Sequence, residues 1–225
     1  MKISEIIKDR IKKEDFFKGC TYKANDNIAE FFGPGELSLL IEEVAEKMNE
    51  VLKALIIDVD NDHNTKETAK RIAKMYVNEI FKGRYIAPPE VTSFPNVTSY
   101  DQIYVTGPIT VRSTCAHHFQ NITGKCYIGV YPGTKVIGLS KFNRIVDWIA
   151  SRPQIQEEMT MHIAEEIKTK TEASGVAVLM QCSHACCTQR GVKEHESNMT
   201  TSVMLGCFRD EFSMKQEFLS IVDKM

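Results

Sequence analysis

Apolar residues recur at helical spacing through the first third of the chain. After the turn FFGPGE at residues 31–36, seven of them follow an i, i+3, i+4 pattern: Leu37, Leu40, Ile41, Val44, Met48, Val51 and Leu55. This pattern predicts an amphipathic helix. A second helix is predicted to begin near Asn64, with Glu67 completing a capping box, and to stop at Gly83. Pro88 and Pro89 lack amide donors and cannot continue a helix. We therefore predict an N-terminal helical region that ends near them and spans residues 1–90.

The pattern changes beyond residue 90. Residues 103–113 and 125–131 are rich in Val, Ile, Thr and Tyr and predict two strands. A helical pair is predicted at 141–150 and 154–171, then strands at 175–182 and 199–208, and a short helix at 211–222. This order predicts an α+β domain over residues 91–225, with helices packed on one face of a mainly antiparallel sheet.

Composition narrows the class of protein. The chain of 225 residues has a formal net charge of −2 with mixed signs, which gives no argument for nucleic acid or an anionic membrane as a partner. No stretch resembles a signal peptide or a membrane span, so we expect a soluble cytoplasmic protein. Seven cysteines, an odd number, favour reduced thiols. Three stand apart and are expected to be packing residues: Cys20, Cys126 and Cys207.

Two segments interleave thiols with imidazoles: STCAHHFQ at 113–120 and CSHACC at 182–187. Zn²⁺ prefers such ligands, and a catalytic site uses three of them and leaves one position for water. In a strand, Cys182, His184 and Cys186 would share one face and Cys187 the other. A closed structural site of four ligands is equally compatible with the spacing: Cys115, His118, Cys182 and Cys186.

Five segments, in order, resemble GTP cyclohydrolase I: KRIAKMYVNEIF, STCAHHFQNITGK, VIGLSKFNRIV, RPQIQEEMT and CSHACCTQRGV. The resemblance begins near Glu67 and runs to the C-terminus. It implies a zinc enzyme that opens the imidazole ring of GTP, releases formate and recloses the product as 7,8-dihydroneopterin triphosphate. It also implies a tunnelling fold, and a homodecamer of two stacked pentameric rings. The product could enter folate, tetrahydrobiopterin or 7-deazaguanine synthesis.

The resemblance implies a role for each matching residue. Zn²⁺ ligands fall on Cys115, His118 and Cys186, and the catalytic histidines on His117 and His184. Glu157 would accept hydrogen bonds from guanine, with Gln156 assisting and Glu158 left to solvent. The triphosphate would be bound by Arg71, Lys74, Ser140, Lys141, Arg144 and Arg190, and the Ser140 hydroxyl is also implicated in the sugar rearrangement.

Three positions depart from the family's pattern. Ala116 replaces a usual glutamate, from which we expect slower turnover or altered metal choice. Cys182 replaces a small apolar residue and would close the open metal position if its sulfur reached the metal. Cys187 is expected to face away. The rival hypothesis is a non-catalytic, zinc-stabilised ring protein of the same fold that binds a nucleotide.

Overall fold

The computed structural model describes residues 2–18 and 22–225, and the side chains of residues 2–13 and 22–225. The prediction for Cys20 lies outside these residues. The chain divides into two compact units, Met1–Ala87 and Pro88–Met225.

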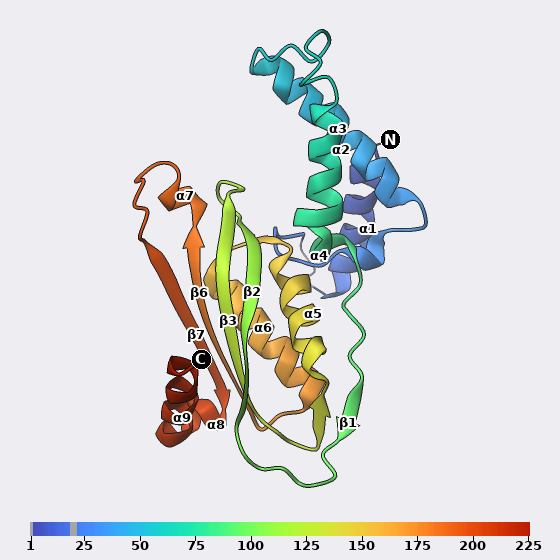
Figure 1. The fold of residues 1–225 in the computed structure, drawn as a ribbon. Coiled ribbons are helices and arrows are strands. Elements are labelled where there is room, and N and C mark those ends of the chain that lie inside the picture. Colours follow the sequence, from blue (N-terminus) through green and yellow to red (C-terminus); the bar gives the residue numbers. More distant parts are fainter. Residues whose placement is uncertain (1, 19–21) are drawn as a thin grey trace. The chain divides into compact units, whose positions relative to one another are not determined.

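Helices form the N-terminal unit (Figure 1). They are α1 (Ile3–Lys18), the short turn η1 (Ala29–Phe31), α2 (Glu36–Ala54), α3 (Thr68–Met75), the π-helical turn η2 (Tyr76–Ile80) and α4 (Lys82–Tyr85). Helix α1 is not among the predicted elements, although Ile3, Ile7 and Ile11 have four-residue spacing. These three side chains are buried in one cluster with Leu40 and Val77, so α1 completes the core of this unit.

The predicted limits of the second helix are wrong at both ends. Helix α3 begins at Thr68, and Glu67 makes no capping hydrogen bond through its side chain. The Asp62 carboxylate instead accepts from the Asn64 amide at 2.8 Å, which favours a turn over a helix start. At the other end, Gly83 lies inside α4, since glycine weakens a helix without forbidding it.

The second unit is built on a five-stranded sheet of order β5-β2-β3-β6-β7. Its strands are β2 (Tyr104–Cys115), β3 (Asn121–Tyr131), β5 (Pro153–Gln154), β6 (Gly175–His184) and β7 (Asn198–Gly206). All neighbours are antiparallel except the short β5, which runs parallel to β2. The prediction of a mainly antiparallel sheet is confirmed. A separate pair joins β1 (Ser93–Pro95) to β4 (Lys135–Ile137).

One face of the sheet is covered by α5 (Leu139–Ala150) and α6 (Gln156–Thr171), as predicted (Figure 1). Alternate residues of β3 and β6 meet these helices in the main buried cluster, which includes Cys126. Cys126 is therefore a packing residue, as expected. Each large side chain buried here contributes about 1.5–3 kcal/mol.

The prediction of helices on only one face is incomplete. The helices α8 (Cys207–Asp210) and α9 (Phe212–Asp223) place Phe208 and Phe218 in a second cluster with Ala177 of β6, on the opposite face. Gly129 makes room for this packing, because a Cβ there would lie 2.6 Å from the Phe218 ring. Cys207 packs against the same cluster, as expected. Strand β6 is apolar on both faces, so both need cover.

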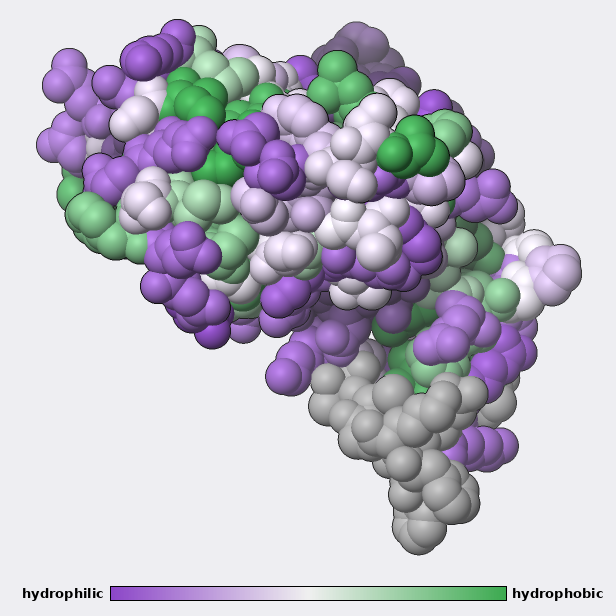
Figure 2. Space-filling view, turned by 90° about the horizontal axis from the view of Figure 1, so that it is seen from below, coloured by the Kyte–Doolittle hydropathy of each residue, from purple (hydrophilic) through white to green (hydrophobic). Residues whose placement is uncertain are grey.

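Hydrophilic and hydrophobic residues are mixed over the face that Figure 2 shows, with the hydrophobic ones in small groups. Among the described residues, no helix combines the length and the apolar character that a membrane crossing requires.

Candidate functional site

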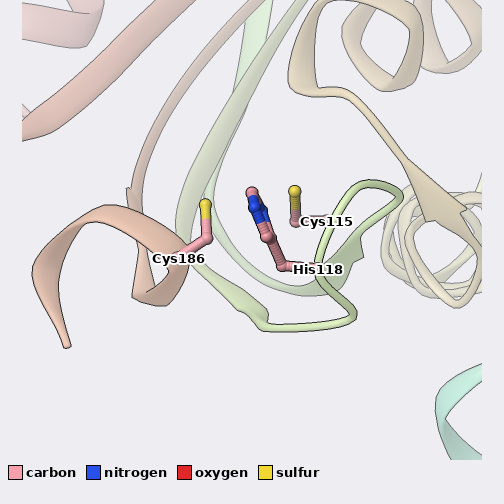
Figure 3. A group of neighbouring side chains, drawn as sticks. All are labelled: Cys115, His118 and Cys186. Carbon is pink, nitrogen blue, oxygen red and sulfur yellow. The ribbon is translucent and has the colours of Figure 1, made fainter. Parts of the chain in front are cut away.

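Two thiols and an imidazole come together at one end of the sheet. The ligand atoms of Cys115, His118 and Cys186 all lie within 4.8 Å of one another. Their side chains project to the same side, from the end of β2, the turn after it and the one-turn helix α7 (Ala185–Thr188) (Figure 3). The first two residues and the third are about seventy positions apart in sequence, and the pairing of β3 with β6 brings them together.

Backbone hydrogen bonds fix the turn that carries His118. The Cys115 amide donates to the Gln120 carbonyl at 2.8 Å, and the Phe119 amide donates to the Cys115 carbonyl at 2.9 Å. The Ala116 amide donates to the Gln154 carbonyl at 3.1 Å, which ties the turn to β5. Cys115 is buried while His118 is exposed, so the group has one closed and one open side.

The three donors fit a tetrahedral metal ion such as Zn²⁺. Two sulfurs bound at about 2.3 Å to one Zn²⁺ lie about 3.8 Å apart, so donors within 4.8 Å need only small side-chain rotations to close on an ion. Burial, and then the neighbouring Cys115 thiol, raise the pKa of Cys186 to about 11. A cation bound beside the Cys186 sulfur would favour its thiolate and offset both effects.

Cys182 and Cys187, the other two cysteines of the segment 182–187, lie outside the group of three candidate metal-ligating side chains. Strand β6 ends at His184 and Cys186 lies on α7, so the prediction that strand alternation places Cys186 beside Cys182 and His184 is wrong. Cys182 is 1% exposed within the main core, and burial raises its pKa to about 12. It is not part of the three-residue group. Cys187 is exposed, with its Sγ 4.0 Å from Cys186 Sγ.

His184 lies beside the group at the end of β6. It is half-buried, and its Nε2 is 2.8 Å from Gln156 Oε1. Burial lowers the pKa of His184, and the Glu157 carboxylate acts in the opposite direction. Glu157 and Glu158 are both exposed in the first turn of α6. His117 is exposed, with its ring centroid 6.3 Å from that of His118.

The residues expected to bind phosphate are more dispersed. Ser140, Lys141 and Arg144 lie on α5, and Lys141 Nζ donates to the Glu90 carbonyl at 2.9 Å. Arg190 is exposed after α7. We call Cys115, His118 and Cys186 the Cys–His group. Within the described part of the second unit, no hydrogen bond or ion pair joins Ser140, Lys141, Arg144 or Arg190 to it. Arg71 and Lys74 are exposed on α3 of the N-terminal unit.

Two threonines that contact Gln156 are not among the predicted site residues. Thr201 Oγ1 of β7 lies 3.0 Å from Gln156 Nε2 and 2.7 Å from Thr160 Oγ1. Thr160 Oγ1 in turn donates to the Gln156 carbonyl at 2.7 Å. The sequence around Thr201 has only the pattern of a strand, which contains no signal for this contact.

Comparison with known proteins adds independent evidence. The sequence profile of the GTP cyclohydrolase I family matches residues 44–223, reaching further toward the N-terminus than the resemblance that begins near Glu67. The chain is 41% identical over 180 residues to "GTP cyclohydrolase 1" of Aliivibrio salmonicida (strain LFI1238), covering 80% of this chain and 82% of that protein. It is 40% identical over 183 residues to the protein of the same name from Actinobacillus pleuropneumoniae serotype 5b (strain L20), covering 81% and 84%. A crystal structure of an archaeosine synthase QueF-Like in the apo form aligns with 47% of this chain and 92% of that one, at 15% identity and a TM-score of 0.37, which is too low to support an argument.

Proposed function

Because this chain belongs to the GTP cyclohydrolase I family, we propose that it opens the imidazole ring of GTP by hydrolysis, releases formate and recloses the product as 7,8-dihydroneopterin triphosphate. The observation that carries the proposal is the convergence of Cys115, His118 and Cys186 within 4.8 Å. His184 is half-buried two positions before Cys186, and the exposed Glu157 carboxylate acts to raise its pKa. A reaction that moves protons on a purine needs groups of these two kinds.

Cys115, His118 and Cys186 would hold the metal, and the exposed side at His118 would admit water and substrate. When bound, Zn²⁺ supplies Lewis acidity and lowers the pKa of a coordinated water to about 7. The burial of Cys182 in the core supports three protein ligands over four.

His117 and His184 are proposed to move protons to and from the ring nitrogens of the substrate. Imidazole suits this role because its ordinary pKa, about 6.5, allows it to donate and accept a proton near neutral pH. His184 is the more rigidly held of the two, since its Nε2 is hydrogen-bonded to a buried amide. His117 is exposed on the turn.

Glu157 is proposed to recognise guanine, through hydrogen bonds that its carboxylate accepts from the ring N1–H and the exocyclic amino group. Its exposed position at the start of α6 leaves it accessible to a ligand. The Oε1 of the residue before it, Gln156, is 2.8 Å from His184 Nε2, and the Glu157 carboxylate acts to raise the pKa of His184. A base held by Glu157 would therefore lie near the proposed proton donor.

The triphosphate is proposed to contact Ser140 and five cationic side chains: Arg71, Lys74, Lys141, Arg144 and Arg190. Arginine forms paired hydrogen bonds with phosphate oxygens, and lysine provides a point charge. The Ser140 hydroxyl, exposed on α5, is also proposed to act in the sugar rearrangement.

We also propose a tunnelling fold assembled as a cytoplasmic homodecamer of two stacked pentameric rings. The nine-residue strand β7 supports this, because it is at an edge of the sheet and its outer side is available to a strand of another copy. An assembly of this kind would let different copies contribute cations to one triphosphate site.

The test is incubation of zinc-loaded protein with GTP, with formate and the pterin product followed together by chromatography, absorbance and fluorescence. We expect the two in equal amounts, and neither from Cys186→Ala. Bound zinc and bound GTP without formate would contradict the enzyme proposal and favour a non-catalytic ring protein.

A further inference from the structure

The side chain of Gln156 is enclosed in the protein. It is fully buried at the start of α6, although the next residue, Glu157, is exposed. Its Nε2 lies 3.2 Å from the Met180 carbonyl, 3.0 Å from the Met199 carbonyl and 3.0 Å from Thr201 Oγ1. Its Oε1 lies 2.8 Å from His184 Nε2. Every polar atom of this amide therefore has a partner in β6 or β7.

These contacts determine the orientation of the amide. A backbone carbonyl can only accept a hydrogen bond, so the side-chain atom that faces Met180 and Met199 must be the NH₂ group. Exchanging the nitrogen and oxygen of Gln156 would place an oxygen against two carbonyl oxygens and leave these buried acceptors without donors.

The two threonines reinforce this orientation. Thr160 Oγ1 donates its only proton to the backbone carbonyl of Gln156 at 2.7 Å. In the contact between the two hydroxyls, Thr201 must therefore donate to Thr160. Thr201 Oγ1 is then left as an acceptor for Gln156 Nε2. Gln156 Nε2 has two hydrogens for three acceptors, so two of these acceptors share one hydrogen. No contact in the chain pairs two donors or two acceptors.

We infer that Gln156 is a positioning residue that holds His184 in the tautomer protonated at Nε2. Since Gln156 Oε1 can only accept, His184 Nε2 must donate, and in the neutral ring the lone pair is then on Nδ1. The catalytic consequence, which rests on the proposed function, is that Nδ1 is the atom through which His184 exchanges a proton with the substrate. This role replaces the expected contact of Gln156 with guanine, because the residue is fully buried and both amide hydrogens already have acceptors in the protein.

The tautomer can be measured without any substrate. In zinc-loaded protein with ¹⁵N-labelled histidine, magic-angle-spinning NMR above the titration range of histidine distinguishes a protonated ring nitrogen from one with a lone pair. The His184→Gln variant identifies the His184 resonances among the six histidines. We expect His184 to be protonated at Nε2 only. Protonation at Nδ1 in the unmutated protein would overturn the inference.

Two variants test whether Gln156 is responsible. In Gln156→Met, of similar length but without polar atoms, we expect the two ring resonances to move toward each other as both tautomers become populated. In Thr201→Val, which disturbs the same network but keeps the Met180 and Met199 carbonyls, we expect the spectrum of the unmutated protein. A Gln156→Met spectrum unchanged from the unmutated protein would show that another contact sets the tautomer.

Kinetics separates positioning from substrate binding. In Gln156→Met we expect kcat for GTP to fall by about tenfold or more, because a positioned proton donor or acceptor contributes about 10²–10⁴-fold, while KM stays within about twofold. A raised KM with unchanged kcat would assign Gln156 to guanine binding and overturn the inference. If the unmutated protein released no formate, the proposed function would fail while the NMR result on the tautomer would stand.

Discussion

Gly124 of β3 lies directly opposite Cys182 of β6, and a Cβ at position 124 would sit 2.7 Å from Cys182 Sγ. The same Cβ would be 2.1 Å from the Gln181 carbonyl oxygen. The Cys182 sulfur therefore fills the space that the missing side chain leaves in the core of the sheet. Packed in this space, Cys182 belongs to the main core and not to the group of Cys115, His118 and Cys186.

The first prediction concerns the glycine. Gly124→Ala should lower the free energy of unfolding by about 1–3 kcal/mol, because the backbone of β6 must move to relieve the overlap. Urea denaturation followed by circular dichroism measures the change. Gly138→Ala, where a Cβ meets nothing within 4 Å, is the matched control and should be close to neutral. Equal effects of the two substitutions would contradict the close approach.

The second prediction concerns Cys182 itself. Cys182→Ala should keep one metal ion per chain and lower the free energy of unfolding by about 1–2 kcal/mol, the effect of a small cavity. Metal content is measured by mass spectrometry of the dialysed protein. Loss of the metal would instead support a closed site of four ligands, in which Cys182 is the fourth.

Cys186 and Cys187 are adjacent thiols with different predicted roles. Cys186→Ala should lose the metal, because its Sγ is part of the three-donor group, whereas Cys187→Ala should retain it. The two substitutions remove the same atoms one position apart, so each is the control for the other. Metal loss in both variants, with circular dichroism unchanged, would show that Cys187 is also a ligand.

An element could be predicted from the sequence where its own apolar residues recur with a period, and not where it depends on contacts between distant residues. The strands β2, β3, β6 and β7 and the helices α5 and α6 could be predicted, because buried elements of ten or so residues impose a period on their apolar positions. The cover of the second sheet face could not be predicted in the same way. It depends on Phe218 fitting over Gly129, a contact between residues far apart in sequence.

The same distinction holds in the site. Cys115, His118 and Cys186 could be named because thiols and imidazoles are chemically distinctive and their segments match a family. The environment of Gln156 could not be anticipated, since it depends on Met199 and Thr201, more than forty positions later in an ordinary strand. A glutamine next to two glutamates at a helix start gives no sign that one side chain is buried and its neighbours are exposed.

Glu157 and Glu158 provide a matched test of guanine recognition. Glu157→Gln should lower kcat/KM for GTP by about 10- to 100-fold, since hydrogen bonds to a charged group are worth about 1.5–3 kcal/mol. Glu158→Gln should change it by less than about twofold. Steady-state assays of formate release measure both. A larger loss in Glu158→Gln would exchange the roles of the two carboxylates.

The last prediction concerns the N-terminal unit, where Arg10 forms a paired contact with Glu36 across α1 and α2. Arg10 Nη1 lies 2.5 Å from Glu36 Oε2, and Nη2 lies 2.7 Å from Oε1. The hydrogen bond from Arg10, and next that from the Gly33 amide, lower the pKa of Glu36 from 4.5 to about 2. A carboxylate with a lowered pKa in the folded state stabilises the fold above its ordinary pKa and loses that contribution as the pH falls toward the lowered value.

We therefore expect native-state hydrogen exchange of the α1 and α2 amides to be faster in Glu36→Gln than in the unmutated protein at about pH 6. The ratio of the two rates should fall toward one as the pH passes down through about 2, because Glu36 then becomes protonated in the folded protein as well. Glu42→Gln, on the exposed side of α2, is the control and should change the rates little at either pH. A ratio that stays constant with pH would mean that the Glu36 charge does not stabilise this unit, and that shape alone accounts for the packing of α1 on α2.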